Sequence, residues 1–152
     1  MSDPVSIREL ILRNVVTVLE AISTANGYQV NVQEVFRVMV VNSNVTEYPA
    51  IVVVPESETK TETPLLCYQT KMIINLECYV DELENVSEEV NILLADVEKA
   101  LMVDHTRGGN AIDTTLIGAD FIYGEDTKPY GVAIAMIEIV YRTRTTDPFS
   151  IQ

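Results

Sequence analysis

The stretch that decides the fold is residues 71–80, which read KMIINLECYV. From Met72 to Val80 every second side chain is apolar, and the residues between them include Asn75 and Glu77. This alternation is the two-residue period of a strand that buries one face. The stretch therefore predicts a half-buried strand that packs its apolar side against other elements.

The chain before this strand predicts two more strands and a loop. Residues 35–41 are rich in β-branched side chains, and residues 48–55 are an apolar run between Pro49 and Pro55 that we expect to end at these prolines. Residues 56–64 are polar or charged apart from Pro64. We expect them to form an exposed, mobile loop, and residues 65–69 to lead into the next strand or to form a short strand of their own.

Two amphipathic helices flank these strands. The first is predicted from Ser2 or Asp3 to the Asn26-Gly27 stop, and its apolar stripe is Ile7, Leu10, Ile11, Val15, Val18, Leu19 and Ile22. The second begins after a cap at Asn85 or Ser87 and ends near Met102. Its stripe is Val90, Leu93, Leu94, Val97 and Leu101.

The rest of the chain predicts a flexible loop over residues 104–110 and then a hairpin of residues 114–123 and 131–141. The last strand is apolar on both faces, so we expect it to be central or covered on both sides. The predicted fold is one α+β domain over residues 1–152, with a flexible tail from about residue 145. An antiparallel or mixed sheet of four or five strands carries two main helices on one face, in the order α-β-β-β-α-β-β.

The net charge is −13, from 23 acidic and 10 basic residues, so the chain should repel nucleic acid. Residues 77–104 hold nine carboxylates and a single base, Lys99, whereas Lys128, Arg142 and Arg144 lie in the last quarter. This polarity either sets the docking face of an assembly or marks a solvated helix face. No apolar run is long enough to cross a membrane and the start lacks a secretory pattern, so we expect a cytosolic protein.

The residues that could carry catalysis or bind a metal are few. His105 is the single histidine, and the sequence has no G-x-S-x-G, phosphate-loop or H-E-x-x-H motif. Cys67 and Cys78 lack metal-site spacing and are interpreted as buried free thiols. We therefore predict no catalytic residue, no cofactor and no metal, and a protein that is not an enzyme.

Several segments together resemble the tail terminator, or tail completion, proteins of tailed bacteriophages. The similar features are the first amphipathic helix, the Tyr-Pro-Ala-Ile-Val segment at residues 48–52 leading into Pro-Glu-Ser-Glu at 55–58, and the strand at 72–80. They continue with the helix at 87–101 and a closing hairpin that ends in Tyr-Arg-Thr at 141–143.

The resemblance implies a virion protein that is assembled in the host bacterial cytoplasm. Its partners would be itself, in a hexameric ring, the tail tube protein, and the head-tail connector, with neither nucleic acid nor membrane in direct contact. The ring would cap the tail tube, end its polymerisation and provide the head-joining surface. A connector or neck protein, a tube subunit, and a small acidic binding module without enzymatic activity remain as alternatives.

The candidate assembly-interface residues are charged side chains in the segments that we expect to protrude, at 56–64, 104–110 and 124–129, and two arginines in the tail of the chain. Rim charges of this kind steer encounter and set register. They are Glu56, Glu58, Lys60, Glu62, Arg107, Lys128, Arg142 and Arg144. The segment at 56–64 is the preferred one, because a sheet would anchor both of its ends.

Overall fold

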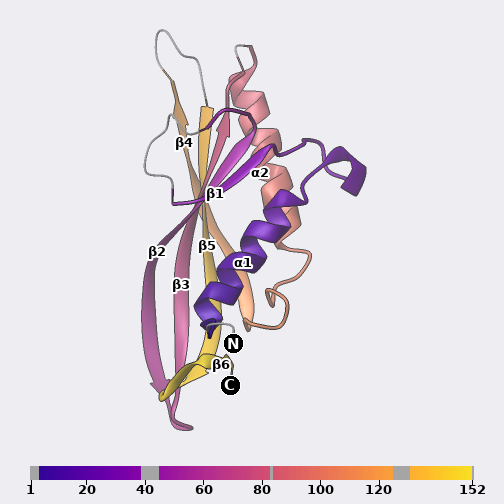
Figure 1. Cartoon of the computed structure of the whole chain (residues 1–152). Coiled ribbons are helices and arrows are strands. Elements are labelled where there is room, and N and C mark those ends of the chain that lie inside the picture. The colour runs from indigo at the N-terminus through magenta and orange to yellow at the C-terminus, as the bar shows by residue number, and fades with distance from the viewer. Residues whose placement is uncertain (1–3, 39–44, 83, 125–130, 152) are drawn as a thin grey trace.

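The computed structural model describes residues 4–38, 45–82, 84–124 and 131–151. Figure 1 shows two helices lying against a long, twisted sheet. The elements in chain order are α1 (Ile7–Glu20), a 3-10 turn η1 (Thr24–Asn26), β1 (Glu34–Arg37), β2 (Ala50–Thr63), β3 (Cys67–Val80), α2 (Val86–Leu101), β4 (Asp113–Tyr123), β5 (Gly131–Arg144) and β6 (Asp147–Ile151).

The strands form one mixed sheet in the order β1-β2-β3-β5-β4, and β6 pairs with the end of β5. β1 runs parallel to β2, while the other neighbouring pairs are antiparallel. β5 lies between β3 and β4, which confirms the predicted central position of this doubly apolar strand. The two edges of the sheet are therefore different strands. One edge is β1 together with the part of β2 after Val53, which we call the far half of β2 and which β1 does not pair with, and the other edge is β4.

Both helices pack on the same face of the sheet (Figure 1). α1 contacts β1 and β2, and α2 contacts β3, β4 and β5. The alternation of residues 72–80 is confirmed, because Met72, Ile74, Leu76, Cys78 and Val80 are all buried beneath the helices. Burying a side chain of this size contributes roughly 1.5–3 kcal/mol, so this face supplies most of the stability.

The opposite face of the sheet, which we call the open face, has no helix over it in the described part of the chain (Figure 1). Val52 of β2 and Val132 of β5 are buried on this face. Other side chains on it are half-buried, and they include Ile73 of β3 and Ile134, Met136 and Val140 of β5.

α1 begins later than the sequence suggested. Its N-cap is Ser6, whose hydroxyl accepts a hydrogen bond from the backbone N–H of Glu9 at 3.2 Å, and the predicted caps Ser2 and Asp3 lie outside the described residues. The spacing of Ser6 and Glu9 is that of a capping box. Gly27 has the predicted left-handed backbone, at φ 92°, but it follows η1 instead of ending α1.

The prediction of a mobile loop at residues 56–64 is wrong. β2 continues through Pro55 to Thr63 and pairs with β3 along its whole length, with a bulge between Pro55 and Ser57. The bulge accommodates the proline, which has no N–H to donate to the ladder. Figure 1 shows the resulting β2–β3 hairpin reaching beyond the first turn of α1.

The α+β class, with two helices and a mixed sheet, is confirmed. The sheet has six strands instead of four or five, and the order of elements includes η1 and β6, which the sequence did not predict. β6 replaces the flexible tail expected from about residue 145, because residues 147–151 turn back and pair with β5. In the described residues, neither helix is both long enough and apolar enough to cross a lipid bilayer.

Candidate assembly interface

β4 is the edge strand with the most exposed apolar surface. It pairs with β5 on one side and with no described strand on the other. Ile117, Phe121, Ile122 and Tyr123 on this strand are each 43–50% exposed. An unpaired edge with exposed large apolar side chains is a surface on which another chain can pair.

The register of β4 places its apolar side chains on both faces of the sheet. Ile122 lies opposite Val132 and points to the open face, whereas Phe121 lies opposite Ala133 and points to the helix side. The β-bulge between Leu116 and Gly118 brings Ile117 to the open face as well. A partner at this edge would therefore contact apolar side chains above and below the strand.

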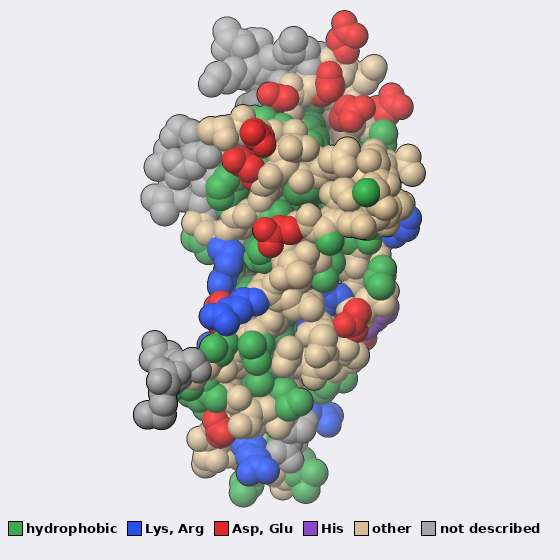
Figure 2. Space-filling view, turned by 45° about the vertical axis from the view of Figure 1, so that its right-hand side comes forward, with side chains coloured by type: hydrophobic (Ala, Val, Ile, Leu, Met, Phe, Trp, Pro, Cys, Tyr) green, Lys and Arg blue, Asp and Glu red, His purple; other side chains and the backbone are tan. Residues whose placement is uncertain are grey.

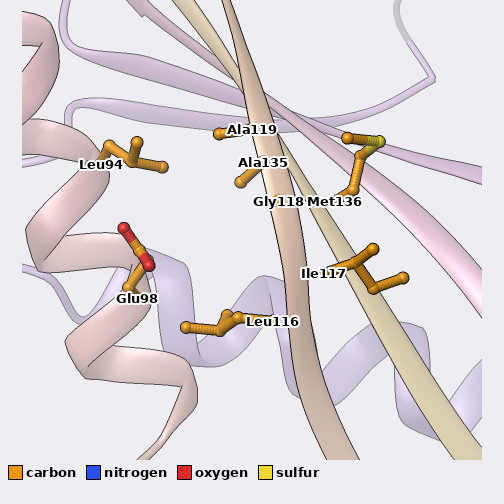
Figure 3. A pocket seen from close by; sticks show the side chains of 8 residues that line it. All are labelled: Leu94, Glu98, Leu116, Ile117, Gly118, Ala119, Ala135 and Met136. Atoms are coloured by element: carbon orange, nitrogen blue, oxygen red, sulfur yellow. The ribbon is translucent and has the colours of Figure 1, made fainter.

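A pocket of about 240 Å³ opens between α2 and β4 at this bulge. Figure 3 shows Leu94 and Glu98 of α2 and Leu116 of β4 pointing into the space between helix and sheet. Ile117 and Met136 point to the other side. The small residues Gly118 and Ala119 of β4 and Ala135 of β5 also line this pocket.

Glu58, a predicted interface residue, is anchored inside the molecule. Its carboxylate accepts hydrogen bonds from the guanidinium of Arg8 on α1 and from the hydroxyl of Tyr141 at 3.0 Å, and the Lys60 ammonium lies 3.3 Å away. Burial alone would raise the pKa of Glu58, but the hydrogen bonds from Arg8 and Tyr141 outweigh it and hold that pKa below its ordinary value. Glu58 joins the hairpin to α1.

The other candidates in this hairpin are divided between the two faces. Glu56 accepts a hydrogen bond from Asn75 at 3.3 Å on the open face. Lys60 donates to Thr70 at 2.9 Å on the helix side, and Glu62 is exposed near the turn. The bulge between Pro55 and Ser57 puts Glu56 on the opposite face from Glu58, Lys60 and Glu62, with which we expected it to act in a loop.

Arg107 was expected on an exposed segment and is fully buried instead. Its Nη2 donates hydrogen bonds to the carbonyl oxygen of Leu101, the last residue of α2, and to that of Asp104. The carbonyl at the end of the helix thereby gains a hydrogen-bond partner. Burial lowers the pKa of Arg107. Asp104 accepts the Thr106 hydroxyl at 2.6 Å and the N–H groups of Gly108 and Thr106 at 2.8 and 2.9 Å, which lower its pKa to about 2. The segment at 104–110 is therefore an ordered turn, and the prediction of a flexible loop is wrong.

Two of the remaining candidates lie in the last residues of β5. Arg142 and Arg144 are exposed on the open face, and the Arg142 guanidinium donates to Gln69 at 2.8 and 3.0 Å. Lys128 lies outside the described residues. The structure thus brings Arg142 and Arg144 together and separates both from Arg107.

His105 lies on the surface, with its Nδ1 atom 3.0 Å from a carboxylate oxygen of Asp113. This hydrogen bond is the main reason why the pKa of Asp113 is below its ordinary value. No group of three or more His, Cys, Asp or Glu side chains suited to a metal ion occurs in the residues that the structure describes.

Sequence reasoning missed the apolar edge of β4. The strand itself was predicted, but residues 116, 117, 121 and 122 are apolar on both parities, as in the central strand β5. In an edge strand the same pattern leaves large apolar side chains exposed. Whether these side chains are buried or exposed depends on whether the strand is central or at the edge of the sheet. The local sequence pattern does not indicate which of the two positions the strand takes.

No family model matches the chain, and no curated protein matches its sequence.

Proposed function

We propose that this chain is a structural subunit that associates with copies of itself in a closed ring, and that the ring is the tail terminator of a tailed phage. The apolar, unpaired edge of β4 carries the first part of this proposal. The second part rests on the resemblance described above.

The form of the sheet favours a ring over a symmetric dimer. A ring needs two different, complementary surfaces on each subunit, whereas a two-fold dimer uses one surface twice. The sheet ends in two different edges, β4 and the β1–β2 side. Within one subunit β4 runs antiparallel to β2. A neighbouring subunit that is rotated about the ring axis and continues the sheet would therefore place the far half of its own β2 beside β4, and the two strands would be antiparallel.

The function requires no chemistry from the chain itself. A terminator ends the growth of the tube by occupying its last exposed subunits, and its work is binding. The proposed role is therefore that of a non-enzymatic virion protein, with the tube protein and the connector as partners.

The test of self-assembly is a pair of substitutions on β4. A lysine on an exposed edge opposes strand pairing, so I117K/I122K should remain monomeric while the wild type forms a closed oligomer. Val103, 77% exposed just after α2, provides the matched control V103K, which should assemble as the wild type does. Light scattering gives the masses, and thermal unfolding checks that all three proteins fold.

The role is tested by adding the wild-type protein to growing tail tubes. A terminator stops elongation, a tube subunit enters the tube and lengthens it, and a connector leaves the length unchanged. Wild-type protein that is monomeric both alone and with tube ends excludes the ring. A wild-type dimer that I117K/I122K disrupts replaces the ring with a two-fold β4 contact.

A further inference from the structure

One end of the molecule, which we call the hairpin end, presents apolar side chains to solvent. It consists of the β2–β3 turn and β6, which lie together in Figure 1. Leu65 and Leu66 in the turn are 80% and 68% exposed, and Phe149 and Ile151 on β6 are 47% and 53% exposed. Side chains of this size at neighbouring positions mark an interaction surface.

The backbone that carries the apolar side chains of the hairpin end is held in place by hydrogen bonds. The carbonyl of Leu66 accepts the N–H of Thr145 at 2.9 Å, which ties the turn to the chain between β5 and β6. Asp147 accepts the N–H of Phe149 at 3.0 Å and the hydroxyl of Ser150 at 2.7 Å. A fixed surface loses little conformational entropy when it binds a partner.

Leu66 has a backbone conformation that leucine rarely adopts. Its φ is 58°, in the left-handed region that glycine and asparagine favour. A leucine here carries a backbone cost and is also largely exposed, so folding gains little from it. Binding is a physical reason for an apolar side chain at this position.

The charge of the hairpin end differs from that of the rest of the molecule. Lys71, Arg142 and Arg144 are exposed on the open face beside the turn. The opposite end, where α2 begins, carries Asp81, Glu82, Glu84, Glu88 and Glu89. Figure 2 shows acidic side chains gathered at that end, and hydrophobic side chains mixed with basic and acidic ones at the hairpin end.

We propose that the hairpin end docks on another protein, at an apolar depression bordered by carboxylates. This inference rests on the proposed function, in which the ring caps the tail tube. Basic side chains beside an apolar protrusion complement such a surface in charge and in polarity. Asp147 lies opposite Arg144 in the β5–β6 pair, so the charge pattern suits a partner with charges at defined positions better than a uniformly anionic lipid surface.

The acidic end of a second copy is also complementary in charge to the hairpin end. Copies joined in this way would stack without limit, because every added copy exposes a new acidic end. A protein that ends polymerisation requires a different partner. The occupant that we infer is therefore the exposed end of the tube protein.

The experiment compares binding to tail tubes purified from the phage that encodes the chain. The variant L65S/L66N removes both apolar side chains, and asparagine tolerates the backbone of position 66. A second variant, K71Q/R144Q, removes two charges. The control V103S loses an equally exposed apolar side chain elsewhere. Co-sedimentation with tubes gives the affinity, and light scattering gives the mass of each variant.

We expect L65S/L66N to keep the wild-type mass and to bind tubes at least about tenfold more weakly, because two apolar contacts are lost. K71Q/R144Q should bind more weakly at low salt and less so at high salt. V103S should bind as the wild type does. Unchanged binding by both hairpin-end variants would overturn the inference.

Three other outcomes separate the alternatives. Wild-type binding to vesicles of phosphatidylcholine and phosphatidylserine, lost in L65S/L66N, would replace the protein partner with a lipid surface. Long stacks of wild-type protein that L65S/L66N abolishes would replace it with a second copy. A wild type that is monomeric both alone and with tube ends, but whose tube binding still depends on Leu65 and Leu66, would support the docking end and exclude the ring.

Discussion

Removing the charge of Glu58 should destabilise the fold. E58Q would leave the Arg8 guanidinium without its ion-pair partner and would weaken the bond from Tyr141. Because Arg8 is half-exposed, water compensates for part of the loss, and we expect a decrease of about 1–2 kcal/mol in the free energy of unfolding. Urea unfolding measures it. E62Q removes the same charge from an exposed position in the same strand and should change stability little.

The contribution of Glu58 should depend on pH in a defined direction. Its pKa in the folded protein is below the ordinary value of 4.5, so the ionised form is favoured by folding. The stabilisation is fully present above pH 4.5 and is lost as the pH falls through the lowered pKa. The stability difference between wild type and E58Q should therefore be constant near neutral pH and shrink in acid. A difference that grows in acid would contradict this assignment.

Two core residues should differ in how much truncation costs. Ile74 is fully buried under the helices, while Leu94 is 8% exposed and lines the pocket beside β4. Truncation to alanine should cost about 2–5 kcal/mol at such sites, with I74A toward the upper part of this range and L94A toward the lower. Thermal unfolding measures both variants. An unchanged melting temperature for L94A would show that this face of α2 is not packed.

At the scale of elements, Asp96 of α2 holds the segment after α1. It is buried, and one carboxylate oxygen accepts the N–H groups of Gln29 and Val30 at 2.8 and 2.9 Å. D96A would leave these donors unpaired and should cost about 2–4 kcal/mol. D96N keeps an oxygen that can accept and should cost less. Equal losses for both variants in urea unfolding would mean that charge, and not hydrogen bonding, is what matters.

The elements that were predicted well are those whose periodic pattern is visible within one segment. The stripe of α2 and the alternation of residues 72–80 each bury one face, so the sequence alone indicates the element and its buried side. Residues 56–63 carry no such pattern, because this half of β2 extends largely into solvent. Their strand conformation comes from pairing with β3 and from threonines at 59, 61 and 63, which suit strands.

The candidate residues were predicted less well, for a related reason. Arg107 lies among polar and glycine residues, which is typical of a loop, and its burial depends on the position of the end of α2. Glu58 looks like its neighbours Glu56 and Glu62, and only the three-dimensional position of Arg8 distinguishes it. Replacing all three glutamates together would therefore disturb the fold as well as any interface.

At the scale of the whole molecule, salt should affect the two proposed contacts in opposite directions. Subunits with a net charge of −13 repel one another, so screening should strengthen self-association through the apolar edge of β4. Docking of the basic hairpin end on carboxylates should weaken under the same conditions. Light scattering and tube co-sedimentation over a salt series measure the two effects. Parallel salt responses would mean that one surface serves both contacts.

The reactivity of the two cysteines can be used to measure local and global unfolding. Cys67 and Cys78 are free and buried, and burial raises the pKa of the Cys78 thiol to about 12. A thiol reagent can reach either sulfur only when the surrounding strands separate. Cys67 lies next to the β2–β3 turn, whereas Cys78 lies in the core beneath the helices. Labelling of Cys67 should therefore record fraying of the hairpin, labelling of Cys78 should record global unfolding, and a bound partner at the turn should slow the first without changing the second.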